Sequence, residues 1–358
     1  MRILILKPSS LGDVVQALPV LRLLKLRWPE SEIHWWVDSK LAPLLEGDSD
    51  LTGVVRFERR RWGSPAHWPA LWRSVRWLRA RSFDLVIDLQ CLARSGAFAW
   101  LANGKVLVGL DEPREGARGF YDIIVPRGSF YTHAVDWYLG VLHALSVPVH
   151  WNFTWLPERA AVAAAIKRKW HAETQRWIAL QPGARWPNKR WPVENYAELV
   201  RRLASTYPHF QFVILGDEAD RESGAAISRV DPQRCLDLTG KISLPEMVEW
   251  VRLSELMIAN DTGPMHVAAA LGRPLLAIFG PTEPRRTGPY RQPGGVVQVN
   301  LPCVPCMKSR CSYSKPLECL RAISPAALFA RAEKILRTSG ACLPNPDRVE
   351  PAPVPPRR

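Results

Sequence analysis

Residues 256–266, Leu-Met-Ile-Ala-Asn-Asp-Thr-Gly-Pro-Met-His, combine a short apolar strand, a polar turn and the start of a helix. A strand that enters a helix through such a turn points free backbone N–H groups beyond its carboxyl end, where open α/β sheets bind phosphorylated ligands. Pro264 suits the first helical turn, because an N–H there would have no partner. The simpler alternative is that Asp261 or Thr262 only caps the helix.

The bulk composition favours a two-domain protein with an anionic partner. The 358 residues suit two domains of roughly 150 residues each. An excess of 48 Lys and Arg over 34 Asp and Glu gives a net charge of +14, which favours nucleic acid, an anionic membrane surface or a phosphorylated substrate. No apolar run approaches the roughly 18 to 20 residues of a membrane span, and residues 2–7 are too few for a signal-peptide core. We expect a cytoplasmic protein whose basic face makes peripheral contact with the inner membrane.

Residues 1–150 alternate expected strands and helices, which predicts a doubly wound parallel sheet. A strand at residues 2–7 is followed by a turn with Ser10, Gly12 and Asp13, and then by a helix that Pro19 should kink or end. Gly12 stands alone, so the turn is not a G-x-G-x-x-G fingerprint and nicotinamide or flavin binding has no support. Asp13 either caps the helix or presents a carboxylate at the strand's carboxyl end.

Basic side chains follow two of these strands. Three consecutive arginines, Arg59, Arg60 and Arg61, lie in a loop after a strand at residues 53–57, and Arg114 and Arg118 lie in a Gly-containing loop. Such arginines grip phosphate or carboxylate groups, or they form a solvated charge run. The sequence leaves both alternatives open.

Residues 158–322 show a second strand-helix alternation, so two facing crevices are the expected site of chemistry. Lys189 lies in a Gly- and Arg-containing loop after the first strand of this series, where it meets a diphosphate or is simply solvated. Glu218 follows the next strand and either accepts hydrogen bonds from ribose hydroxyls or only begins a helix.

The seven cysteines, an odd number without a secretion signal, argue for reduced thiols or metal ligands. Four of them, Cys303, Cys306, Cys311 and Cys319, are spaced like a soft-metal site, and unliganded or locally paired thiols are the alternative. A helix within residues 323–338 should return to brace the first domain. The Pro-rich tail, residues 339–358, should be disordered.

Four motifs in combination resemble the lipopolysaccharide heptosyltransferases of glycosyltransferase family 9. They are residues 6–19 (Leu-Lys-Pro-Ser-Ser-Leu-Gly-Asp-Val-Val-Gln-Ala-Leu-Pro), 88–90 with 94–96, 181–184 with 189–192, and 260–266. The resemblance covers residues 1–338. It implies the GT-B fold, an ADP-heptose donor bound by the C-terminal domain, a lipopolysaccharide core acceptor bound by the N-terminal domain, and inversion at the anomeric carbon. It implies no required cofactor. Similar cysteine clusters occur in some family members, so the resemblance leaves open a structural metal at the cysteines.

The resemblance also assigns roles to residues. It implies that Asp13 is the catalytic base. The implied donor-binding residues are Lys189 on the diphosphate, Glu218 on the nucleoside, and Asp261, Thr262, Gly263 and His266 in the donor turn. The implied acceptor-binding residues are Lys7, Ser10, Gly12, Arg59, Arg60, Arg61 and Arg118.

These roles are chemically coherent, because an inverting transfer needs a base on one face of the sugar and a stabilised diphosphate on the other. A helix N-terminus lowers the pKa of Asp13 and weakens it as a base, whereas a partly desolvated cleft would raise that pKa. The carboxylate of Asp261 should bind sugar hydroxyls, while the N–H groups of Thr262 and Gly263 suit the diphosphate. Asp48-Ser49-Asp50 superficially matches a metal-dependent transferase motif in a polar loop away from the donor turn.

Three other functions stay open at this point. One is a GT-B transferase of another nucleotide sugar. The second, a metal-containing nucleic-acid-binding protein, is suggested by the charge and the cysteines, although no nucleic-acid motif accompanies them. The third is a transferase scaffold that has lost activity.

Overall fold

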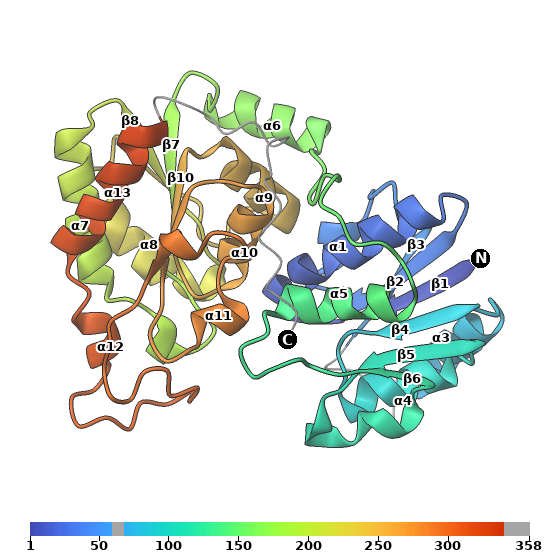
Figure 1. Ribbon diagram of the computed structural model, residues 1–358. Helices are drawn as coiled ribbons and strands as arrows, with labels where there is room; N and C mark the ends of the chain where they lie inside the picture. Colours follow the sequence, from blue (N-terminus) through green and yellow to red (C-terminus); the bar gives the residue numbers. More distant parts are fainter. Residues whose placement is uncertain (59–67, 340–358) are drawn as a thin grey trace.

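The computed structural model describes residues 1–58 and 68–339 as two α/β domains that lie side by side (Figure 1). Each domain contains one six-stranded parallel sheet. The predicted class, two Rossmann-like domains with parallel sheets in the GT-B arrangement, is therefore confirmed. The boundaries at residues 1–150 and 158–322 stay a prediction, and each sheet falls inside one of these ranges.

The first sheet has the strand order β3-β2-β1-β4-β5-β6. Its strands are β1 (Arg2–Leu6), β2 (Glu32–Asp38), β3 (Gly53–Phe57), β4 (Leu85–Asp88), β5 (Val106–Leu110) and β6 (Ile123–Val125). The helices of this half are α1 (Leu11–Arg27), α2 (Ala42–Leu45), α3 (Trp68–Arg79), α4 (Ala93–Leu101) and α5 (Ala134–Ala144), with 3-10 turns η2 (Pro113–Glu115) and η3 (Ala117–Phe120). The winding direction reverses between β1 and β4, which places the binding crevice of this fold at their carboxyl ends.

The second sheet repeats this topology in the order β12-β11-β10-β7-β8-β9. Its strands are β7 (Arg176–Gln181), β8 (Phe210–Ile214), β9 (Cys235–Asp237), β10 (Leu256–Asn260), β11 (Leu275–Ile278) and β12 (Val296–Val297). The helices are α6 (Ala160–Trp170), α7 (Val193–Thr206), α8 (Arg221–Ser228), α9 (Leu244–Leu253), α10 (Gly263–Ala270), α11 (Pro284–Thr287), α12 (Glu318–Arg321) and α13 (Pro325–Ser339), with η4 (Pro187–Lys189), η5 (Glu218–Asp220) and η6 (Pro293–Gly295). Here the winding reverses between β7 and β10.

The central strands are apolar because helices cover both faces of each sheet. Four residues of β1 and all five residues of β10 are buried. A parallel sheet buried in this way needs continuous apolar runs instead of alternation, which is why both strands are readable in the sequence. No helix within residues 1–58 and 68–339 is both long and apolar enough to span a membrane.

Helix α1 passes through Pro19 without ending, so the expected early break is wrong, while the alternative of a kink stays a prediction. A proline leaves the carbonyl four residues earlier without its helical partner, and that carbonyl belongs to Val15. The indole Nε1 of Trp155 donates to the Val15 oxygen at 2.8 Å. A side chain from the segment that joins the two domains thus replaces the missing hydrogen bond.

Helix α13 packs against α7 of the second domain, with further contacts to β10 and β11. Its apolar side chains Leu328, Ala332 and Leu336 belong to the same core cluster as Leu199 and Leu203 of α7. The expectation that residues 323–338 brace the first domain is therefore wrong: the apolar stripe of the helix is satisfied within the second domain. The tail at residues 340–358 lies outside the described residues.

The two domains meet where the N-termini of α1 and α10 approach each other, and these helices are in extensive contact. Two glycines allow the approach. A Cβ on Gly12 would lie 2.4 Å from Cδ2 of His266, and a Cβ on Gly263 would lie 2.8 Å from a methyl carbon of Leu11. The first turn of each helix therefore contains a glycine at the point of contact.

Candidate active site

Asp13 lies in the first turn of α1, directly after β1. Its Oδ2 accepts hydrogen bonds from the backbone N of Ser10 at 2.9 Å and from the Ser10 hydroxyl at 2.7 Å. Its Oδ1 accepts from the hydroxyl of Tyr138 at 3.2 Å and lies 4.0 Å from Nζ of Lys7. Asp13 therefore fulfils both sequence alternatives: one oxygen caps the helix, while the other belongs to a polar cluster at the carboxyl end of β1.

The surroundings hold Asp13 in its ionised form. Burial opposes ionisation, but the ammonium of Lys7 and the two hydrogen bonds from Ser10 outweigh it, so the pKa of Asp13 lies below its ordinary value. Lys7 is itself buried, and its Nζ donates to the carbonyl of Leu89 at 2.9 Å. Burial acts to lower the pKa of Lys7, yet Tyr138 and Asp13 raise it above the ordinary value, so this lysine remains a cation. Since Lys7 is covered, it acts on this site through Asp13.

Lys189 and Asp261 form a close ion pair in the second domain. Nζ of Lys189 lies 2.6 Å from Oδ2 of Asp261, and the hydroxyl of Thr282 donates to the same oxygen at 2.5 Å. Lys189 closes η4 after β7, Asp261 follows β10, and Thr282 follows β11. Three neighbouring strands thus contribute to one cluster at the carboxyl edge of the sheet. Nζ of Lys189 also lies 4.8 Å from the ring of Trp186.

The turn before α10 leaves its backbone donors open. Thr262 occupies the cap position without a side-chain capping bond, and Asp261 uses its carboxylate on Lys189 instead of capping. Within the described chain, no protein acceptor pairs with the N–H groups of Thr262 and Gly263. The alternative that Asp261 is only a cap is therefore wrong, and the open donors suit an anionic ligand.

His266 lies between the two clusters. Its Nδ1 is 3.2 Å from Nε2 of Gln16 on α1, so one hydrogen bond joins the N-terminal parts of the two facing helices. Burial lowers the pKa of His266 to about 4, against the opposing charges of Asp261 and Asp13. The imidazole is consequently neutral near pH 7 and serves as a hydrogen-bonding spacer between two carboxylates.

The other predicted site residues are more dispersed. Glu218 begins η5, its side chain is 77% exposed, and it pairs with Arg221 of the next helix at 3.2 Å. Arg118 on η3 pairs with Asp111 at 3.1 Å, and within the described residues it forms no ion pair with Asp13. The predicted acceptor residues Arg59, Arg60 and Arg61 lie outside the described residues.

Asp48 and Asp50 have a structural partner. The Arg22 guanidinium contacts Asp48 at 2.5 Å and Asp50 at 2.6 Å, with both arginine and Asp48 side chains almost fully covered. The same guanidinium donates to the carbonyl of Trp155 at 3.3 Å. The Asp-Ser-Asp stretch therefore anchors α1 and the interdomain segment, which explains it without a metal.

Sequence reasoning missed three members of the two clusters: Tyr138, Thr282 and Gln16. Each becomes a neighbour only through the fold, since Tyr138 is on α5, Thr282 follows β11, and Gln16 faces a residue of the other domain. Thr282 could have been predicted from its position in the sequence, because it follows a strand whose carboxyl end lies at the same edge of the sheet as Asp261.

The fold, with two facing Rossmann-like domains and parallel sheets, is that of the GT-B class. A family model described as glycosyltransferase family 9 (heptosyltransferase) matches residues 71–316, and the chain belongs to this family. Because the chain belongs to this family, a glycosyltransferase is favoured over the other functions that the sequence left open.

Individual relatives agree with the family. The chain is 31% identical to lipopolysaccharide heptosyltransferase 1 of Pseudomonas aeruginosa, over 87% of this chain and 88% of the relative. It is 28% identical to lipopolysaccharide heptosyltransferase 2 of Salmonella typhimurium, over 84% and 88% respectively. The solved structure of Escherichia coli ADP-heptose lipopolysaccharide heptosyltransferase II matches with a TM-score of 0.77 and 23% identity, covering 95% of this chain and all of the other, and shows the shared fold.

Proposed function

We propose that this enzyme transfers a heptose from an ADP-heptose donor to the inner core of lipopolysaccharide, with inversion at the anomeric carbon. One observation carries the proposal: Asp13 in the first domain and the Lys189–Asp261 pair in the second lie on opposite sides of the contact between Gln16 and His266. The donor and acceptor named here are those in the names of the relatives, and both are acidic, which suits the net charge of +14.

In the proposed reaction, Oδ1 of Asp13 accepts the proton of the acceptor hydroxyl as its oxygen bonds to the anomeric carbon. The bond from that carbon to the diphosphate breaks on the opposite face, and ADP leaves with the electron pair. Lys189 and the N–H groups of Thr262 and Gly263 stabilise the charge that develops on the diphosphate. Asp261 holds the Lys189 ammonium and accepts hydrogen bonds from the donor sugar, while exposed Glu218 is available to the ribose.

A carboxylate of lowered pKa is a weak base toward a free hydroxyl, so the proton must transfer late. The hydroxyl becomes acidic only once its oxygen has begun to bond to carbon, and then even Asp13 can accept the proton. The hydrogen bonds from Ser10 and Tyr138 hold the carboxylate in one orientation for that step.

We also infer that helix α3 rests on the membrane surface that carries the lipid-linked acceptor. Trp68 and Trp72 are more than half exposed, and Arg73, Arg76 and Arg79 occupy the same helix. None of these arginines pairs with a carboxylate among the described residues. Tryptophan and arginine together suit the boundary between acyl chains and anionic headgroups.

The direct test is to incubate the pure protein with ADP-heptose and other nucleotide sugars and to follow thermal unfolding, transfer to heptose-deficient lipopolysaccharide, and the anomeric configuration of the product. We expect ADP-heptose to stabilise the fold by about 2.7 kcal/mol at about 100 times its Kd. If only another nucleotide sugar stabilises the fold, that sugar is the donor instead of ADP-heptose. Retention of the anomeric configuration in the product would refute the inverting mechanism. No effect of any ADP-sugar would contradict the proposal.

A further inference from the structure

The loop between β6 and α5, residues 126–133, reaches from the first domain to α11 of the second (Figure 1). The guanidinium carbon of Arg286 on α11 lies 4.8 Å from the ring centre of Phe130. Nε2 of His133 lies 3.0 Å from the carbonyl oxygen of Gly288, at hydrogen-bonding distance. These contacts hold the loop against α11, so side chains of both domains meet there.

Two arginines at this contact, Arg127 in the loop and Arg286 on α11, have no acidic partner. In the part of the chain that the structure describes, neither forms an ion pair with a carboxylate. Nη2 of Arg127 donates to the carbonyl of Thr132 at 2.6 Å, while its Nε is covered and has no protein partner. The neighbouring Arg285 differs, because both oxygens of Glu283 accept hydrogen bonds from it at 3.0 Å.

The unpaired charges of the two arginines act on each other. Burial and the positive charge of Arg286 lower the pKa of Arg127 to about 10, against the opposing effects of Tyr138 and Glu112. Arg127 is still a cation at pH 7. Two neighbouring cations without an anion repel each other, and such perturbed charges are typical of sites that bind a ligand of the opposite sign.

The two arginines flank the candidate active site. Arg127 interacts electrostatically with Tyr138 on α5, and the hydroxyl of Tyr138 donates to Oδ1 of Asp13 at 3.2 Å. Arg286 follows closely after Thr282, a member of the cluster in the second domain. An anion held between the arginines would therefore contact both domains beside the proposed base.

We propose that Arg127 and Arg286 together bind a negatively charged group of the acceptor, a phosphate or a carboxylate. The planar guanidinium offers paired N–H donors that match the oxygens of either group. The donor diphosphate fits this site less well, because Arg127 belongs to the domain of Asp13 and the diphosphate already has Lys189 in the proposed reaction. The inference rests on the proposed function and adds a determinant of acceptor specificity to it.

The test compares wild type and Arg286→Gln in transfer from ADP-heptose to three acceptors: heptose-deficient lipopolysaccharide, the same acceptor after phosphatase treatment, and the same acceptor with its carboxylates converted to neutral amides. We expect Arg286→Gln to raise the KM of the untreated acceptor roughly 10- to 100-fold, with an unchanged donor KM. Arg127→Gln should act in the same direction. The treatment that removes the bound anion should raise the wild-type KM and abolish the difference between the proteins, which identifies the anion as phosphate or carboxylate.

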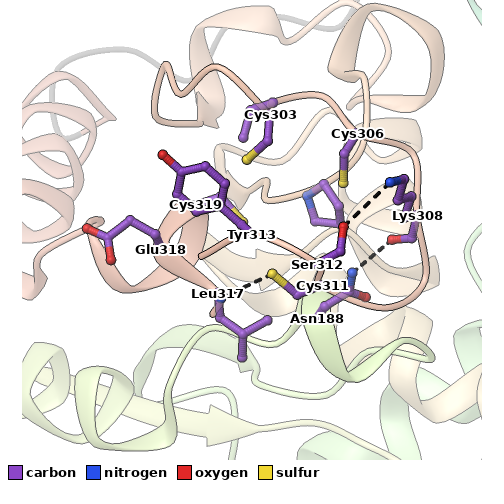
Figure 2. Close-up of a pocket in the computed structure, with 12 residues that line it drawn as sticks. Asn188, Cys303, Cys306, Lys308, Cys311, Ser312, Tyr313, Leu317, Glu318 and Cys319 are labelled. Atoms are coloured by element: carbon purple, nitrogen blue, oxygen red, sulfur yellow. Dashed lines mark hydrogen bonds between the residues drawn. The ribbon is translucent and has the colours of Figure 1, made fainter. Parts of the chain in front are cut away.

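The matched control is Lys308→Gln, which makes the same charge change in the second domain, outside α11. Nζ of Lys308 donates to the hydroxyl of Ser312 at 3.5 Å, on the wall of a separate cavity of about 310 Å³ (Figure 2). The cysteines predicted as metal ligands line the same cavity: Cys303, Cys306, Cys311 and Cys319. Their metal stays a prediction, and within residues 1–58 and 68–339 no three His, Cys, Asp or Glu side chains form a group that could hold a metal ion.

Binding of inorganic phosphate supplies a readout without transfer. With ADP present to occupy the proposed donor site, phosphate should stabilise wild type against thermal unfolding more than chloride does at equal ionic strength, and it should stabilise Arg286→Gln less. Equal phosphate stabilisation of the two proteins would overturn the anion site, whether or not the wild type transfers heptose. A wild type without transfer would instead refute the proposed function.

Three kinetic outcomes would also overturn the inference. They are an unchanged acceptor KM in Arg286→Gln, an increase in the donor KM alone, and an equal increase in the acceptor KM in Lys308→Gln. The first would leave the arginine without a role in acceptor binding, the second would assign it to the donor, and the third would show that only net charge matters.

Discussion

At the level of single residues, the proposed base is Asp13. In Asp13→Asn the side chain keeps its shape but cannot accept the proton, so we expect kcat to fall roughly 10²- to 10⁴-fold, the usual contribution of a general base. Steady-state transfer assays check this. Thermal stabilisation by ADP-heptose should be unchanged, because the proposed donor site lies in the other domain. Turnover near the wild-type rate in a folded variant would remove Asp13 from the mechanism.

Lys189 is the corresponding proposed residue on the donor side. Lys189→Met removes the ammonium and keeps the length, and loss of a charged hydrogen bond of about 1.5–3 kcal/mol should raise the donor KM roughly 10- to 100-fold. The variant also leaves buried Asp261 without its cation, so Lys189→Met/Asp261→Asn is the control for stability. If the double variant regains stability but not donor affinity, the lysine contacts the donor. An unchanged KM in both variants would contradict that role.

At the level of helices and strands, the sequence was most informative where a strand enters a helix. The turns before α1 and α10 and the loop after β7 were recognisable from local patterns, and Asp13, Asp261 and Lys189 followed from them. The partners of these residues were not recognisable, because Tyr138 is 125 positions from Asp13 and Gln16 is 250 positions from His266. The amphipathic pattern of α13 predicted a helix but could not reveal which domain its apolar stripe would cover.

Helix α3 supports a prediction at this same level. Arg73→Glu/Arg76→Glu should weaken binding to vesicles that contain anionic lipid, because each basic residue near such a surface contributes about 1 kcal/mol. Co-sedimentation with vesicles measures the effect, and neutral vesicles should bind neither form. The matched control is Arg201→Glu/Arg202→Glu, which makes the same charge change on α7 of the second domain. Equal losses in the two variants would show that net charge, and not α3, determines binding.

Across the whole molecule, several hydrogen bonds hold the two domains together, and one of them lies in the candidate active site. Arg159 donates to the carbonyls of Pro43 and Leu44 at 2.8 and 2.6 Å, and Tyr290 donates to Asp136 at 2.6 Å. Alongside these anchors, the bond from Gln16 to His266 joins the segments that carry the proposed base and donor turn. A substitution or protonation of His266 should therefore affect both the contact between the domains and the candidate active site.

This contact should make stability depend on pH. The folded pKa of His266 is about 4 and the unfolded value about 6.5, so between these values the unfolded chain binds the extra proton and stability falls as pH falls. From pH 7.5 to 5 the loss should be about 2 kcal/mol. Asp261 and Asp13 act to raise this pKa, and His133 and Lys189 to lower it, but burial has the largest effect.

Denaturant unfolding of wild type and His266→Gln at the two pH values isolates this contribution, because the other titrating groups are common to both proteins. The glutamine can keep a hydrogen bond to Gln16 but cannot titrate, so its stability should decrease less on acidification. An equal loss of unfolding free energy on acidification in the two proteins would show that His266 is free to protonate in the folded state. The interface between α1 and α10 would then have to open at mild acid pH, separating Asp13 from the donor turn before the protein unfolds.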